Sequence, residues 1–126
     1  MRTRPFALLF GTAAVALLAA CSGSSGSSST TPANVDVVLT ATNSLTWAEK
    51  DVTATAGDVV VELKNESNIQ HNLYIIAADG TENPKSVTST GNGDNQVETV
   101  TLTAGTYTVI CTIPGHANMK ATLTVA

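Results

Sequence analysis

The stretch TYTVICTIPGHANMKATLTV, residues 106–125, decides the fold and holds most of the reactive side chains of this sequence. Both of its ends alternate apolar with polar residues, and the in-phase apolar residues are Tyr107 and Val109, then Ala121, Leu123 and Val125. Such a period of two is typical of β-strands with one buried face. Pro114-Gly115 between them is a turn signal. The stretch therefore predicts two consecutive strands joined by a loop.

The same alternation recurs through residues 34–126, where helical periodicity is hard to find. The other in-phase sets are Val35/Val37/Leu39, Val52/Ala54/Ala56, Val59/Val61/Leu63, Leu73/Ile75/Ala77 and Val100/Leu102. About seven short strands separated by turn signals predict an all-β fold, a Greek-key antiparallel β-sandwich. The Gly- and Asn-rich residues 78–95 are long for a connection. They predict a functional loop, a short irregular element or a mobile segment.

The first 20 residues read as an export signal. Arg2 and Arg4 give a positive start, and the apolar run that follows is too short for a typical membrane-spanning helix. The run ends in small residues before Cys21, which resembles the lipobox of bacterial lipoproteins, where cleavage exposes a Cys that is then lipidated. We expect residues 1–20 to be a lipoprotein signal peptide and Cys21 to carry lipid. The alternative is an ordinary signal peptide with a chance Cys.

This interpretation predicts the organisation of the mature chain. Residues 21–33 are the lipidated Cys and a Gly/Ser-rich tether, and residues 34–126 are one folded domain. Loss of Arg2 and Arg4 changes the formal net charge from −4 to −6, so nucleic acid is not an expected partner. With Cys21 lipidated, Cys111 has no disulfide partner. A metal would account for a lone thiol outside the cytoplasm.

The reactive residues share the inward phase of the predicted strands. His71 is in phase with Leu73, Cys111 with Val109, and Met119 with Ala121, while His116 lies in the turn. Two imidazoles, a thiolate and a thioether suit copper, in the His₂Cys arrangement with a weak axial Met. A thioether adds little for zinc, no calcium-type carboxylate cluster is present, and with Cys21 lipidated no second Cys is left for iron–sulfur ligation.

Each of these residues also has an ordinary structural interpretation. A lone inward His is commonly a hydrogen-bonded core residue, a lone Cys a small buried hydrophobe, and an in-phase Met a core filler. The metal hypothesis is favoured because Cys111, His116 and Met119 fall within nine residues. Cys111 and His116 could alternatively form a nucleophilic pair, but no orienting third group is recognisable, so we do not expect an enzyme.

Two blocks of sequence resemble the cupredoxin family, the small blue copper proteins that include plastocyanin and azurin. VVVELKNESNIQHN, residues 59–72, is similar to the family's strand, Asn-containing turn and first ligand, and TYTVICTIPGH, residues 106–116, to its azurin-type second half. The resemblance covers residues 34–126. It implies one type 1 copper ion bound by His71, Cys111 and His116, with Met119 as axial ligand.

The resemblance also implies that Asn72, which follows the first ligand, ties the two ligand loops together with Thr112 as its partner. The spacing departs from the family at one point. Only Ala117 and Asn118 separate His116 from Met119, fewer than in azurin or plastocyanin, although amicyanin also has two.

The expected function is single-electron transfer by a monomeric blue copper protein outside the cytoplasm, tethered to a bacterial membrane through Cys21 and serving redox partner proteins. The alternative is copper capture or delivery without electron transfer. Both uses need the same metal site, so the residues alone do not separate them.

Overall fold

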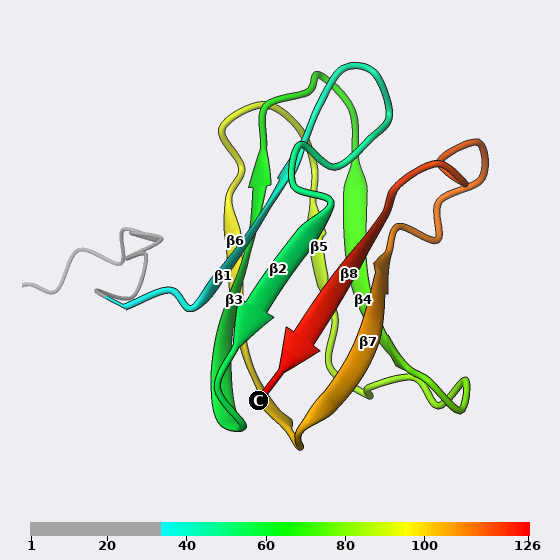
Figure 1. Ribbon diagram of the computed structural model, residues 1–126. Coiled ribbons are helices and arrows are strands. Elements are labelled where there is room, and N and C mark those ends of the chain that lie inside the picture. Colours follow the sequence, from blue (N-terminus) through cyan, green and yellow to red (C-terminus); the bar gives the residue numbers. More distant parts are fainter. Residues whose placement is uncertain (1–33) are drawn as a thin grey trace, which may run out of the picture.

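The computed structural model describes residues 34–126 (Figure 1). The predicted signal peptide, the lipidation of Cys21 and the tether of residues 21–33 lie outside the described residues. Within residues 34–126 no helix is long and apolar enough to cross a membrane.

The described chain forms two β-sheets packed face to face, which confirms the predicted all-β sandwich. One sheet has the order β1-β3-β6 and the other the order β2-β8-β7-β4-β5. The strands are β1 (Val37–Ala41), β2 (Asp51–Ala54), β3 (Gly57–Asn65), β4 (His71–Ala77), β5 (Val87–Ser89), β6 (Gln96–Leu102), β7 (Gly105–Ile110) and β8 (Lys120–Val125).

The core lies between the sheets and follows the predicted alternation. In β8, for example, Ala121, Leu123 and Val125 are buried and the residues between them are exposed. Each fully buried large aliphatic side chain contributes roughly 1.5–3 kcal/mol to folding. The residues that fill the space between the sheets include Leu39, Val59, Val61, Leu63, Leu73, Ile75, Val100, Val109 and Leu123.

Two strand pairs are parallel, unlike the antiparallel pairing predicted for the whole sandwich. β1 pairs in parallel with β3, and β2 pairs in parallel with β8. The other pairs are antiparallel. Alternation shows which face of a strand is buried but carries no information on strand direction. β1 and β2 belong to different sheets, so each can pair with a strand distant in sequence.

The stretch of residues 78–95 contains a short element, but this is the regular strand β5 and not the irregular one that the sequence suggested. β5 extends the larger sheet by pairing with the start of β4, with Ser89 opposite His71. Farther from that point, the Lys85 ammonium donates to the Glu98 carboxylate at 2.9 Å and to the Thr99 carbonyl at 2.7 Å. The stretch is therefore tied to both sheets.

Candidate metal centre

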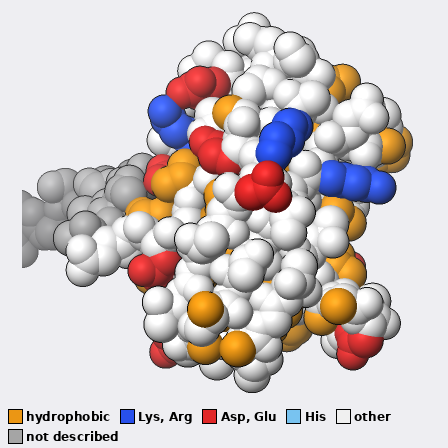
Figure 2. Space-filling model, in the orientation of Figure 1, with side chains coloured by type: hydrophobic (Ala, Val, Ile, Leu, Met, Phe, Trp, Pro, Cys, Tyr) orange, Lys and Arg blue, Asp and Glu red, His pale blue; other side chains and the backbone are white. Residues whose placement is uncertain are grey.

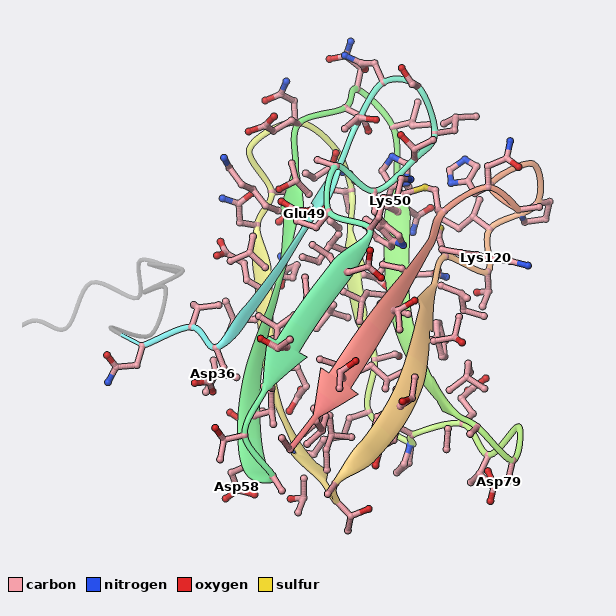
Figure 3. The ribbon with its side chains drawn as sticks, in the orientation of Figure 1. Asp36, Glu49, Lys50, Asp58, Asp79 and Lys120 are labelled. Atoms are coloured by element: carbon pink, nitrogen blue, oxygen red, sulfur yellow. The ribbon has the colours of Figure 1, made fainter. Side chains whose placement is uncertain are left out.

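The four predicted ligands lie at one end of the sandwich. His71 begins β4, Cys111 directly follows β7, and His116 and Met119 lie in the β7–β8 loop, drawn in orange to red in Figure 1. β4 and β7 are antiparallel neighbours, so the start of one strand lies beside the end of the other. Lys120 lies at this end of the sandwich, whereas Asp58 and Asp79 lie at the opposite end (Figure 3).

The structure brings the donor atoms of His71, Cys111 and His116 to within 4.8 Å of one another. The Cys111 Sγ lies 3.4 Å from the His116 Nδ1, and the two imidazole centroids are 4.8 Å apart. All three side chains are buried. The backbone places three ligand-type atoms around one point without any disulfide, since Cys111 is a free thiol.

Met119 is also fully buried, and its backbone forms hydrogen bonds with the backbones of Cys111 and His116. The Cys111 N–H donates to the Met119 carbonyl at 3.2 Å, and the Met119 N–H donates to the His116 carbonyl at 2.9 Å. The two-residue step from His116 to Met119 is therefore compatible with a closed loop. It places Met119 beside the Cys and the His rather than on the outer surface.

The loop owes its shape to a tight turn over Ile113–His116. The His116 N–H donates to the Ile113 carbonyl at 3.0 Å, and Gly115 has a φ of +90°. Pro at the second position and a residue of positive φ at the third are typical of a type II turn. Glycine adopts that conformation without a Cβ clash, so the Pro114-Gly115 pair carries His116 back toward Cys111.

Two hydrogen bonds of the Asn72 side chain join the start of β4, after His71, to the loop that follows Cys111. The Asn72 amide donates to the Thr112 hydroxyl at 2.8 Å, and the Thr112 N–H donates to the Asn72 Oδ1 at 2.7 Å. The structure thus pairs the residues that the resemblance implied. A bond on each side of the amide restrains the residue after His71 against the residue after Cys111.

His71 has one ring nitrogen bonded and the other free. Its Nε2 lies 2.7 Å from the Ser67 hydroxyl, whereas its Nδ1 is buried and has no hydrogen-bond partner among the described residues. Burial, and secondarily the charge of His116, lower the pKa of His71 below its ordinary value. The ring is therefore neutral at neutral pH and has a lone pair available for a metal.

Sequence reasoning missed Ser67, which contacts the predicted ligand His71 directly. It lies within the Asn-Glu-Ser-Asn turn between β3 and β4, which was interpreted only as a turn signal. The spacing of four residues to His71 was the available sign, but a serine in a turn is common without any ligand nearby.

The residues present fit a type 1 copper site. A buried imidazole nitrogen without a partner is costly unless a group such as a metal occupies it. Two imidazoles, a thiol and a thioether are the donor set that copper prefers in both of its oxidation states. The fold and the site together define a copper-binding β-sandwich.

The comparison with protein families agrees with this class. The sequence model of the copper binding proteins of the plastocyanin/azurin family matches residues 33–126. The chain belongs to this family, the cupredoxins. The comparison with curated proteins gave no match.

Solved structures of auracyanin A and amicyanin share the fold. The chain is 26% identical to auracyanin A, a "blue" copper protein from the green thermophilic photosynthetic bacterium Chloroflexus aurantiacus, over 71% of this chain and 96% of that one, with a TM-score of 0.56. Amicyanin from Paracoccus versutus is 18% identical over 75% of this chain and 84% of its own, with a TM-score of 0.55. The second likeness is one of fold alone.

Proposed function

We propose that the protein carries single electrons between redox partners, using a type 1 copper ion that alternates between Cu(I) and Cu(II). The observation that carries this proposal is the convergence of His71, Cys111 and His116 within 4.8 Å in a buried position. We assign these three residues as the strong ligands and Met119 as the axial one. The auracyanin A likeness supports the same use, since that protein is a "blue" copper protein.

The way the ligands are held favours electron transfer over copper delivery. Electron transfer is fast when ligands move little between oxidation states, and this requires a stiff support. His71 and Cys111 lie at the ends of neighbouring strands, and the Asn72–Thr112 bonds join the loops that contain them. A delivery protein has to release its ion, and buried ligands whose loops are joined by hydrogen bonds do not favour release. Nothing beyond holding copper is required of Cys111 and His116, so we propose no catalytic role for them.

Redox cycling in the presence of a competitor tests this function. The full chain is loaded with Cu(II), reduced and reoxidised repeatedly beside a Cu(I) chelator, and the visible absorption is followed. An electron carrier keeps its copper and recovers the absorption after each cycle. If the chelator removes the copper once the ion is reduced, so that the absorption does not return on reoxidation, the result would instead indicate the alternative, copper capture or delivery.

Apolar side chains around the ligands provide the surface for brief docking of a partner. Ile113 is partly buried against the core, and Pro114 and Ala117 are exposed. Ile69 is a large hydrophobic residue of the described chain that is 44% exposed. His116 lies beside this collar and is the ligand from which we expect electrons to leave. On the face shown in Figure 2, acidic and basic side chains are mixed, so no single acidic field covers that face.

We also propose that the protein acts outside the cytoplasm, as a monomer held to a bacterial membrane by lipid on Cys21. The support is the sequence alone: a positive start, a short apolar run and small residues before the Cys. Lipoprotein processing adds more than one acyl chain, which stable anchoring requires. The Gly/Ser-rich residues after Cys21 would then hold the copper domain off the surface.

Replacing Cys21 with Ser is expected to release the protein from the membrane fraction and to abolish incorporation of labelled fatty acid. The physical reason is the loss of the only thioether attachment point at the predicted cleavage site. Cys111→Ser is the matched control, because it removes the other thiol and should retain both label and membrane association. Membrane association that survives Cys21→Ser would contradict the anchor.

A further inference from the structure

A chain of buried hydrogen bonds runs from the ligand His71 into the turn before β4. The His71 Nε2 lies 2.7 Å from the Ser67 Oγ, and the Ser67 Oγ lies 2.9 Å from the Asn65 Oδ1. His71 and Ser67 are completely buried and Asn65 is nearly so. No water reaches these atoms to exchange partners with them, so the direction of each bond is set by the protein groups themselves.

The orientation of the Asn65 amide follows from its backbone partners. The Ser67 backbone N–H, which can only donate, points at the Asn65 Oδ1 at 2.9 Å. The Ile69 carbonyl, which can only accept, receives the Asn65 Nδ2 at 2.9 Å. Exchanging the amide oxygen and nitrogen would put two donors together on one side and two acceptors on the other. Asn65 therefore presents an oxygen to the Ser67 hydroxyl.

The oxygen of Asn65 determines where the single hydroxyl proton of Ser67 goes. The acceptors around this hydroxyl are the Asn65 Oδ1 at 2.9 Å and the Ile69 carbonyl at 3.3 Å, and neither carries a proton. When Ser67 donates to Asn65, its lone pair is left for His71. The proton between Ser67 and His71 then belongs to the His71 Nε2.

We propose that Ser67, oriented by Asn65, is a positioning residue that holds His71 in the tautomer protonated at Nε2 and leaves the Nδ1 lone pair for copper. The opposite tautomer would place an N–H at the buried Nδ1, where the described residues offer no acceptor. This inference rests on the proposed function only in taking copper as the partner of Nδ1. The tautomer itself is a property of the protein without metal.

The position of Asn65 is secured by the stretch of residues 78–95. The Asn65 Nδ2 donates to the Ser89 hydroxyl at 2.8 Å, the Asn65 N–H donates to the Asn95 Oδ1 at 3.1 Å, and the Gly93 N–H donates to the Asn65 carbonyl at 2.9 Å. Ser89 in turn donates to the Asp94 carbonyl at 2.5 Å. Every polar atom of Asn65 has a partner, which gives this otherwise unexplained stretch a role in supporting the ligand.

Loss of the Ser67 hydroxyl changes both affinity and potential in a predictable direction. An acceptor at Nε2–H raises the basicity of a metal-bound imidazole, and removal of such a partner lowers metal affinity about 10- to 100-fold. An imidazole stabilises Cu(II) more than Cu(I), and this difference becomes smaller when the imidazole is less basic. Reduction to Cu(I) is then easier. Ser67→Ala should therefore bind Cu(II) about 10- to 100-fold more weakly and have a raised reduction potential.

The test uses the full chain in three forms besides the wild type: Ser67→Ala, Ser67→Thr and Ser89→Ala. In the copper-free wild type, ¹⁵N NMR of the two histidine rings should show His71 protonated at Nε2. Ser67→Thr keeps a hydroxyl and should restore the affinity and potential lost in Ser67→Ala. Ser89→Ala removes a fully buried hydroxyl that accepts from Asn65 but is not bonded to His71, so it should lower thermal stability and shift the potential less than Ser67→Ala does.

The outcomes separate this inference from the proposed function. His71 protonated at Nδ1 in the copper-free wild type would overturn it, as would an unchanged affinity and potential in Ser67→Ala. The NMR measurement decides the matter even where Ser67→Ala fails to fold. A wild-type protein that binds no copper but has the Nε2–H tautomer would refute the function while leaving the assignment of Ser67 intact.

Discussion

Cys111→Ser is expected to abolish the intense visible absorption of the copper-loaded protein and to weaken copper binding by more than about 100-fold, beyond the loss seen when a supporting partner is removed. The absorption arises from charge transfer between a thiolate and Cu(II). A serine hydroxyl is not ionised at neutral pH, so it supplies neither the soft donor nor the charge-transfer transition. His71 and His116 remain, and they can retain at most a weak, pale Cu(II) complex.

The substitution tests the site rather than the fold. Cys111 is buried directly after β7, and Ser is slightly smaller than Cys, so the copper-free variant should keep its β-sheet circular dichroism. Absorption spectroscopy during a Cu(II) titration, with Cys21→Ser as the control that removes the other thiol, is the measurement. An equally intense band in Cys111→Ser would mean that copper binds elsewhere.

The strand faces and the ligand cluster were accessible from the sequence because both depend on local patterns. A two-residue period reports one buried face, and three of the four proposed ligands fall between Cys111 and Met119. His71 was found through its inward phase with Leu73, and its block of sequence also resembles the family's first-ligand region. The structure then brings it to the others because β4 pairs with β7.

Other features depend on long-range contacts, which no local pattern records. The parallel pairing of β1 with β3 follows from the crossing of the chain between sheets. β5 has three residues and owes its existence to β4. Trp47 is buried at 1% exposure although it forms only an isolated bridge with Ala41, so no alternation marks it. Ser67 acquires its role only when the turn folds against His71 and Asn65.

The site and its support therefore differ in how they are encoded. The ligands are rare residue types, which makes them conspicuous in a chain with two His and two Cys. The residues that hold them are Asn, Ser and Thr, which are common in every turn of a small β-protein. Only the distances between them show which ones act on the ligands, as in the Asn72–Thr112 pair and the Asn65–Ser67 pair.

Met119→Leu is expected to raise the reduction potential and to shift the visible spectrum while leaving the fold intact. A weak axial thioether donates to Cu(II), and a hydrocarbon cannot, so its loss disfavours the oxidised state. Met119 is fully buried, and a Met-to-Leu exchange conserves volume, so the unfolding free energy of the copper-free protein should fall by less than about 1.5 kcal/mol. If Met119 only filled the core, Met119→Leu would leave the potential and the visible spectrum of the copper-loaded protein unchanged.

Met119→Gln supplies the opposing arm of the experiment. Its amide oxygen is a harder donor than a thioether, so it should stabilise Cu(II) and lower the potential, opposite in sign to Met119→Leu. Voltammetry and absorption spectra of both variants measure the axial position directly. Potentials that stay at the wild-type value in both would assign Met119 to the core alone. Opposite shifts would show that the two-residue step from His116 suffices to bring the thioether to the metal.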